Sequence, residues 1–469
     1  MKRMQLPGGA VSGAVSSVWR ALHRTQRRRQ GASPSTDRST ASRRRLWRAS
    51  AGIAAVCVVA GVSATSIAYA SGPPPPPPHP LYVSPSGTSR HADTSCATAG
   101  YTSIQTAVNA VPSGDTVYVC AGTYYQQVVV SKPNVTLTGA GTTQTVLDPS
   151  TTSPVLGTDL DTAKPLVAVV DVDPGVSGVT VSNFKIDGNG LRGTYMEDFG
   201  CGDPDFAGVA FQDASGTAVD LDVTTFELTP VTLFYCASNP AVGLLVQSGP
   251  RGSARVTMSQ STITTYKNGI FCEDAGTTCD ISHNTITGGP APTTGEGYNG
   301  VVVLTGASAT ISHNTISDNY YKPRVFTSPE PQATWATGLE LLGAKSVEVT
   351  NNTFTNDQIA VNLVHTNGTV KNNGITDSTF LGGIGVFAVP CTIYCTTLGV
   401  APGGTQQVTV EDNTISLGAP DTGTGIWAGD PTATRTGSVV VDLQGNTVFG
   451  AYNNVVLGPT ASGTVSAPR

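Results

Sequence analysis

The chain repeats a six-residue phrase in which apolar and polar positions keep a fixed order. An apolar residue comes first, two mostly small or polar residues follow, and Asn, Thr and a second apolar residue complete the phrase. The clearest copies are ISHNTI at 281–286 and ISHNTI at 311–316. The others are VSNFKI (181–186), LDVTTF (221–226), MSQSTI (258–263), VTNNTF (349–354), VKNNGI (370–375), VEDNTI (410–415) and LQGNTV (443–448). Repeats of this length are typical of solenoids, propellers and arrays.

The distance between successive copies restricts the architecture. The nine copies start between 21 and 40 residues apart, and the shortest unit runs from Val349 to Val370. Such a unit can hold three short strands and their turns, whereas a propeller blade needs four strands. The units are rich in Val, Ile, Thr, Asn and Gly, which favour strands and turns over helices. The sequence therefore predicts an all-β fold, a single-stranded parallel β-helix of about ten coils stacked about 4.8 Å apart.

Each copy from residue 258 onward is followed by a second phrase, a strand that usually begins with Gly. It reads NGIFC (268–272), NGVVV (299–303), TGLEL (337–341), IAVNL (359–363), GGIGV (382–386), TGIWA (424–428) and NNVVL (453–457). The alternation of a strand predicts an inward column of side chains: Ile270, Val301, Leu339, Val361, Ile384 and Ile426. The predicted outward set is Gln212, Gln247, Phe271, Glu273, Val302, Glu340, Asn362, Phe387 and Trp427.

The Asn of the first phrase forms a column of its own. We expect the isoleucines around Asn284 and Asn314 to point into the core, with each Asn at a turn. Stacked Asn side chains can hydrogen-bond from coil to coil, and the column continues through Asn352, Asn373, Asn413 and Asn446. His283 and His313 come directly before it and suggest a metal pair at first sight. Because their column continues as Asn351, Asn372, Asp412 and Gly445, we interpret them as exposed turn residues.

The predicted β-helix domain covers residues 81–457 and leaves residues 458–469 as a C-terminal tail. Residues 102–111 (TSIQTAVNAV) place Ile104, Ala107, Val108 and Val111 on one helical face. This predicts a short N-terminal helix that caps the first coil, because the ends of a solenoid need covering.

Residues 81–141, with the NNTI and Gly-led units that follow, resemble the right-handed parallel β-helix proteins of the pectin-lyase-like superfamily. The resemblance implies right-handed coils, a polysaccharide or surface glycan as partner, and an active site on the outer face of one strand stack beside the long loops. It leaves the activity open, because the fold hosts lyases, hydrolases, esterases, epimerases and non-catalytic tailspikes or adhesins. The motifs of its polygalacturonases and pectate lyases are absent from the sequence.

The first 70 residues differ from the rest of the chain. Residues 1–48 contain arginine runs, and the small apolar stretch 49–70 ends in Ala-Tyr-Ala. This predicts an export signal peptide with cleavage near Ala70, and therefore a secreted or cell-surface protein; a single membrane anchor is the alternative. Residues 42–47 resemble a twin-arginine export motif. Residues 71–80 are a proline-rich spacer, and no later stretch is long and apolar enough to span a membrane.

Beyond Ala70 the chain is acidic, with 14 Lys and Arg residues against 31 Asp and Glu residues, a formal net charge of −17. Such a surface repels nucleic acid and favours a neutral glycan, or a uronate bound through a cation. We expect a monomer. The even number of cysteines predicts disulfides in an exported chain, for which sequence proximity suggests Cys272–Cys279, Cys391–Cys395, Cys96–Cys120 and Cys201–Cys236. A metal site is the alternative for Cys391 and Cys395.

Three residues are candidates for catalysis. Glu273 and Glu340 lie two coils apart in neighbouring outward columns, which implies a separation of roughly 10–12 Å. Glycosidases hold their two carboxyl groups about 5–9.5 Å apart, so two solvated surface acids are the alternative reading. Lys267 comes just before NGIFC. The resemblance implies that it could remove a proton beside a uronate carboxyl, as basic residues do in lyases of this fold.

The remaining candidates bind substrate or metal. Lys322, Arg324 and Trp335 lie in the long loop 319–338, and Asn362 and Trp427 lie on the predicted outward face. Aromatic rings stack on the apolar faces of sugars. Four carboxylates between residues 187 and 206 offer the oxygen ligands that calcium prefers: Glu197, Asp198, Asp203 and Asp205. The alternative to all of these functions is a non-catalytic, glycan-binding or structural β-helix.

Overall fold

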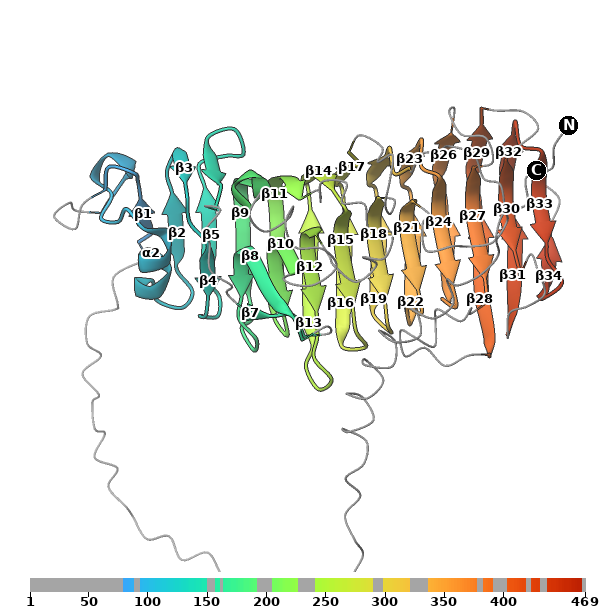
Figure 1. The fold of residues 1–469 in the computed structure, drawn as a ribbon, viewed down its shortest axis with the longest axis horizontal. Helices are drawn as coiled ribbons and strands as arrows, with labels where there is room; N and C mark the ends of the chain where they lie inside the picture. The colour runs from blue at the N-terminus through green and yellow to red at the C-terminus, as the bar shows by residue number, and fades with distance from the viewer. Residues whose placement is uncertain are drawn as a thin grey trace, which may run out of the picture. The chain divides into compact units, whose positions relative to one another are not determined.

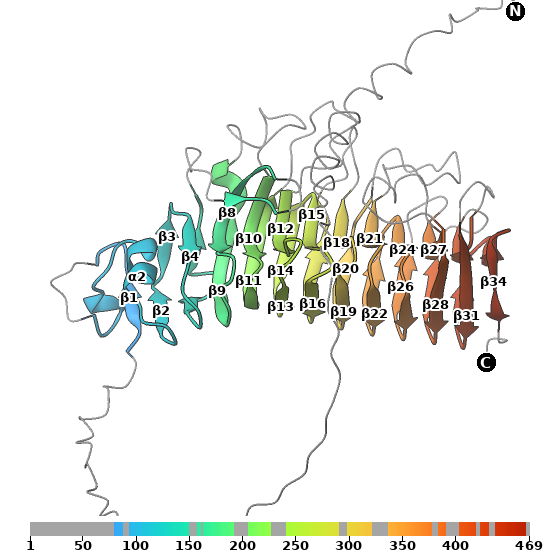
Figure 2. The ribbon, with the colours of Figure 1, turned by 90° about the horizontal axis from the view of Figure 1, so that it is seen from below.

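The computed structural model describes residues 79–87, 93–149, 157–160, 163–191, 205–226, 241–289, 298–320, 336–377, 383–390, 403–418, 423–430 and 437–465. They belong to one compact unit, Pro75–Arg469. Figure 1 shows its strands following one another in chain order along one axis, and Figure 2 shows the same succession from another side. None of the helices in these ranges is long and apolar enough to cross a membrane.

The Gly-led strands form one parallel stack, the path of a twelve-stranded sheet. Its members are β4 (Val128–Val130), β8 (Pro165–Val172), β10 (Asp205–Gln212), β12 (Ala241–Gln247), β15 (Asn268–Glu273), β18 (Asn299–Leu304), β21 (Thr337–Leu342), β24 (Ile359–Val364), β27 (Ile384–Val389), β30 (Thr424–Ala428) and β33 (Asn453–Leu457). A short strand off this path, β7 (Gly157–Thr158), pairs antiparallel with β8. We call the side of this sheet that faces away from the core the outer face.

The other strands form a parallel sheet of 22 members. One stack contains β1 (Leu81–Val83), β2 (Thr116–Val119), β5 (Thr136–Gly139), β9 (Val179–Asp187), β11 (Ser215–Phe226), β13 (Ala254–Ser259), β16 (Thr277–Ser282), β19 (Ser308–Ser312), β22 (Ser346–Thr350), β25 (Gly368–Lys371), β28 (Thr405–Glu411), β31 (Ser438–Gln444) and β34 (Ala461–Val465). The rest are β3 (Gly122–Tyr124), β6 (Thr145–Leu147), β14 (Thr262–Tyr266), β17 (Thr285–Thr287), β20 (Thr315–Ser317), β23 (Thr353–Thr355), β26 (Gly374–Asp377), β29 (Thr414–Leu417) and β32 (Thr447–Phe449). The predicted right-handed parallel β-helix is confirmed.

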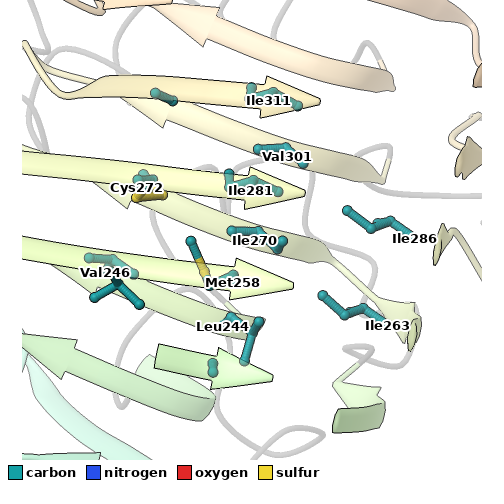
Figure 3. Close-up of a cluster of buried hydrophobic side chains, with 14 of the residues drawn as sticks. Leu244, Val246, Met258, Ile263, Ile270, Cys272, Ile281, Ile286, Val301 and Ile311 are labelled. Atoms are coloured by element: carbon teal, nitrogen blue, oxygen red, sulfur yellow. A yellow bond between two sulfur atoms is a disulfide. The ribbon is translucent and has the colours of Figure 1, made fainter. Parts of the chain in front are cut away.

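Columns of aliphatic side chains fill the space between the sheets. Figure 3 shows Ile270 and Val301 from the Gly-led stack facing Ile281 and Ile311 from the opposite stack, and all four are fully buried. The register confirms the predicted inward column except in β27, where Val386 pairs with Val361. The assignment of Ile384 to that column is therefore wrong. Gly385, and not Gly383, takes the place of the leading glycine, since a Cβ on Gly385 would lie 2.6 Å from the backbone oxygen of Gly425.

The Asn column is a continuous hydrogen-bonded ladder. Asn284, Asn314, Asn352, Asn373 and Asn413 each donate both the backbone N–H and the side-chain amide to the side-chain oxygen of the next Asn, at 2.9–3.1 Å. All five are at most 2% exposed. The predicted ladder is therefore confirmed.

The residue before each ladder Asn has a left-handed backbone. The φ angles of His283, His313, Asn351, Asn372 and Asp412 lie between 54° and 59°. Asn, Asp and His tolerate this conformation better than other side chains, which explains the composition of the column. The imidazole rings of the two histidines stack with their centroids 4.9 Å apart. Both histidines lie at exposed turns, as the sequence predicts.

The two ends of the solenoid differ. At the N-terminal end α2 (Ile104–Ala110) begins after Ser103, whose hydroxyl accepts the N–H of Thr106, and it buries Ile104, Ala107 and Val108. This confirms the predicted capping helix. Two short 3-10 helices, Cys96–Thr98 and Gly188–Leu191, complete the helical elements of the described residues. At the other end β34 pairs in parallel with β31. The solenoid therefore continues past residue 457, which corrects the predicted boundary with the tail.

Two of the expected disulfides are present. Cys96 bonds to Cys120, and Cys272 of β15 bonds to Cys279 of β16 inside the coil, where Figure 3 shows the sulfur atoms among the aliphatic columns. The other two expected pairs, Cys201–Cys236 and Cys391–Cys395, lie outside the described residues. The predicted signal peptide lies outside them as well, as does most of the spacer.

Candidate functional site

One outward column combines a carboxylate, an amide and two aromatic rings. The register aligns Val302 of β18, Glu340 of β21, Asn362 of β24, Phe387 of β27 and Trp427 of β30. Neighbouring strands lie about 4.8 Å apart, so the four members from Glu340 to Trp427 span roughly 14 Å. We call these four residues the outer column. The sequence predicts that all four point outward, and the register agrees.

Two polar groups of the outer column have no hydrogen-bond partner although they are buried. Asn362 is 6% exposed, and its Oδ1 accepts no hydrogen bond. The indole N–H of Trp427 is buried as well and donates to no acceptor. Leaving a buried polar group unpaired costs about 1–3 kcal/mol. One acceptor and one donor on the same column are therefore left without a hydrogen-bond partner.

The aromatic part of the outer column rests on an apolar wall. Phe387 packs with Ile359, Val364 and Val389 in a buried cluster, and Trp427 packs against that cluster. The rings of Phe387 and Trp427 meet edge to face with centroids 6.1 Å apart. Edge-to-face geometry is a favourable arrangement for aromatic pairs. The indole is thus held by packing, while part of its ring remains exposed on the outer face.

A second polar group lies on the outer face toward the N-terminal coils. Gln212 and Gln247 align with Glu273, which is 5% exposed. The amide of Gln247 donates to Gln212 Oε1 at 2.8 Å and to Asp159 Oδ2 at 3.3 Å. Gln212 in turn hydrogen-bonds the carboxylate of Asp171. These five side chains, which we call the amide chain, are each at most 5% exposed.

Burial raises the pKa of Asp171 to about 6, and the negative charge of Asp173 adds to the rise, while the hydrogen bond from Gln212 opposes it. A carboxyl group with such a pKa is protonated for part of the time near neutral pH. Asp171 and Asp159 were not expected from the sequence. The only signal for Asp171 is an acidic residue inside the otherwise apolar strand LVAVVDV (166–172).

The two predicted catalytic glutamates lie on the same face but not side by side. Glu340 aligns with Val302 on the preceding coil and with Phe271 one coil before that. Glu273 lies two residues beyond Phe271 on β15. Strand spacing and rise then put the two Cα atoms roughly 12 Å apart. An inverting glycosidase holds its carboxyl groups about 6.5–9.5 Å apart. The backbone alone does not bring this pair within that range.

Lys267 and Glu273 lie at opposite ends of one strand. Lys267 directly precedes β15 and Glu273 is its last residue, so six residues of extended chain separate their Cα atoms by about 20 Å. The two residues are close in the sequence, but an extended strand separates them along the sheet. Both residues have other interaction partners.

The remaining candidates cannot be placed together. Lys322, Arg324, Trp335, Glu197, Asp198 and Asp203 lie outside the described residues. Asp205 is fully buried in β10, and the Nζ atom of Lys164 lies 4.0 Å from its Oδ1 atom. In the part of the chain that the structure describes, no group of three His, Cys, Asp or Glu side chains is placed to hold a metal ion. The expected calcium site stays a prediction.

Comparison with known proteins bears on the fold. Residues 250–390 and 299–464 match a family model described as a right handed beta helix region. No curated protein sequence matches the chain. Similar solved structures include the A-module of a mannuronan C-5 epimerase from Azotobacter vinelandii, 16% identical over 78% of this chain and 94% of its own, with a TM-score of 0.40.

Two further solved structures have the same general likeness. A lacto-N-biosidase from Eubacterium ramulus is 14% identical over 83% of this chain and 68% of its own, with a TM-score of 0.45. A tailspike from an Acinetobacter phage is 11% identical over 82% of this chain and 63% of its own, with a TM-score of 0.47. At such identities none of these likenesses assigns an activity to this chain.

Proposed function

We propose that this right-handed parallel β-helix of the pectin-lyase-like superfamily binds a polysaccharide along the outer column, outside the cell. One observation carries the proposal: the column contains an unpaired buried acceptor on Asn362 and an unpaired buried donor on Trp427. A sugar hydroxyl that reached these atoms could donate to the first and accept from the second. Two disulfides among the described residues are compatible with an oxidising, extracellular location.

The chemistry of the column favours a neutral glycan. Trp427 offers a partly exposed ring, and aromatic rings pack on the apolar faces of sugars while polar groups at their edges form hydrogen bonds. Glu340 can accept hydrogen bonds from hydroxyl groups. Its negative charge, and the surplus of acidic residues in the chain after Ala70, would repel a uronate that came without a cation.

Binding is the primary proposal, and turnover of the bound glycan is the second. The Cα atoms of Glu273 and Glu340 lie roughly 12 Å apart, so hydrolysis by this pair would need the two side chains to lean toward each other until their carboxyl groups are within about 9.5 Å. Asp171 favours a catalytic role in one respect, because its pKa of about 6 is in the range that suits a general acid. A lyase reaction would instead use Lys267. Calcium would then have to bridge the acidic protein surface and the uronate substrate.

Binding can be measured by calorimetry on a panel of neutral and uronate polysaccharides, with and without calcium. We expect binding of a neutral glycan that Asn362→Leu and Trp427→Ala each weaken at least tenfold. Tyr125→Ala is the matched control, because Tyr125 is an exposed aromatic residue far along the chain from the column. If no glycan binds, or if all three variants bind equally well, the outer column is not the binding site.

Turnover is tested on the same panel by new reducing ends and by the absorbance of unsaturated products. Products that disappear in Glu340→Gln or Glu273→Gln would support a hydrolase, and products that disappear in Lys267→Ala would support a lyase. Binding without any product would leave a non-catalytic glycan-binding protein.

A further inference from the structure

Among the described residues, the core is open at the last coil. The inward column of the Gly-led stack is buried through β30, where Ile426 is 1% and Ala428 is 0% exposed. On the next strand, β33, Val455 pairs with Ile426 and Leu457 pairs with Ala428. These two inward side chains are 37% and 43% exposed. They would be buried in the same way if one more layer of strands lay against β33.

The strands of this coil are also unpaired on their outer edges. Among the described residues β33 pairs with β30 and β34 pairs with β31, each on one side only. Proteins usually protect such edges with charged residues, with proline in the strand or with a covering segment. α2 covers the first coil at the N-terminal end of the solenoid. Nothing comparable is described over β33.

The last coil is uncharged, unlike the rest of the solenoid. Residues 443–468 contain no Asp, Glu, Lys, Arg or His. They do contain exposed apolar side chains, with Phe449 57%, Tyr452 68% and Val465 52% exposed. An uncharged apolar edge is suited to association, whereas edges of soluble monomers are normally charged.

We propose that two copies of this chain associate end to end through the last coil, with β33 antiparallel to β33 of the second copy. A second copy is the occupant that the charges favour. Residues 71–442 carry the whole acidic surplus, with 31 Asp and Glu residues against 13 Lys and Arg residues, so two copies repel each other when they approach side by side. The uncharged end is the surface on which two copies can meet without that repulsion. The proposed dimer differs from the monomer that the sequence suggests.

The strand sequence fits a two-fold interface. In β33, Asn453-Asn454-Val455-Val456-Leu457, a two-fold axis at Val455 puts Val455 opposite itself and the inward Leu457 opposite Asn453. An interface with this symmetry uses the same patch on both copies. It keeps the inward side chains of both strands on the core side, because residues two apart share a face. Each open core is then closed by the other.

The mass of the purified protein in solution tests the proposal. Sedimentation equilibrium over a hundredfold range of concentration should show a dimer. Val455→Lys should give a monomer, because two ammonium groups would face each other at the axis. Val440→Lys is the control, since Val440 is similarly exposed at 36% but lies on β31, which β34 covers. Thermal unfolding by circular dichroism shows whether each variant is folded.

Cross-linking tests the register independently. Val455→Cys should form a disulfide between two copies on mild oxidation, because residues opposite each other in an antiparallel pair have Cβ atoms about 4.5–5.5 Å apart. A wild-type monomer at all concentrations would overturn the proposal, as would a folded Val455→Lys variant that stays dimeric. A Val455→Cys dimer that does not cross-link would overturn the pairing of β33 with itself.

Discussion

Asn314 and Asn352 are joined by two hydrogen bonds that converge on one atom. Oδ1 of Asn352 accepts the side-chain amide of Asn314 at 3.0 Å and its backbone N–H at 2.9 Å. The same amide also donates to the backbone oxygen of Ile281 at 2.9 Å. Each Asn thus satisfies backbone groups that the turn would otherwise leave unpaired inside the protein.

We predict that Asn314→Ala lowers the free energy of unfolding by about 3 kcal/mol, because it leaves several buried donors and acceptors without partners. Denaturant unfolding would measure the loss. Asn446→Ala should cost less, because Asn446 is only partly buried at the end of the ladder. His313→Asn should have little effect, since Asn also tolerates the left-handed backbone. Equal losses in all three variants would contradict a specific role for the ladder.

A buried carboxyl group between β23 and β24 predicts a dependence of stability on pH. Burial raises the pKa of Asp357 to about 8, against two hydrogen bonds from Asn319 that lower it. The folded protein therefore holds a proton that the unfolded chain releases near pH 4. The stability that this group contributes is complete below about pH 4 and is lost as the pH rises to about 8.

Asp357→Asn removes this titration while it keeps an oxygen for the donors of Asn319. We expect the variant to be more stable than the wild type at pH 8, with a flatter stability profile between about pH 6 and 8. Part of the slope below pH 6 should remain, because the pKa of Asp171 is also raised, to about 6. Asp280→Asn, at an exposed position of β16, is the control. If the melting temperatures of wild type and Asp357→Asn run parallel over this range, Asp357 is not the titrating group.

Two strand glycines should respond in opposite ways to a side chain. A Cβ on Gly338 would lie 2.7 Å from the backbone oxygen of Ala360, whereas a Cβ on Gly374 would have no atom within 4 Å. Gly374 pairs with Thr353 and Thr414 on the neighbouring coils. We predict that Gly374→Thr stabilises the fold by up to about 1 kcal/mol, because Thr suits a strand and restricts the unfolded chain.

Gly338→Ala should destabilise the same protein, since a backbone oxygen cannot move aside as a flexible side chain can. Differential scanning calorimetry of the two variants would show melting temperatures on opposite sides of the wild-type value. A rise for both, or a fall for both, would contradict this account of why glycine leads the strands of one stack.

The repeat makes most of the fold predictable, because each phrase contains a strand, a turn and an inward position in fixed order. The error at Ile384 has a local cause. Gly383 and Gly385 both fit the leading position in GGIGV, and only the approach of the next coil's backbone to Gly385 distinguishes them. The boundary at 457 was missed because β34 lacks the phrase.

The candidate site was less predictable, because its residues come together through stacking and not through proximity in the sequence. Glu340, Asn362 and Trp427 could be aligned from the repeat alone. That Asn362 and Trp427 lack hydrogen-bond partners depends on packing. Asp159 joins the amide chain from beyond β7 through a hydrogen bond to a residue 88 positions later, and no pattern in the sequence connects the two.

The indole of Trp427 allows its hydrogen bond and its ring to be tested separately. Trp427→Phe keeps an aromatic ring on the outer face but removes the buried N–H. If that N–H donates to a bound glycan, the substitution should weaken binding roughly threefold to tenfold, as expected for one hydrogen bond of about 1 kcal/mol. Trp427→Ala should weaken it further, because stacking is lost as well. Calorimetry at one temperature measures both steps. If Trp427→Phe binds as tightly as the wild type, the ring alone carries the contact, and the donor assigned to this indole is not used.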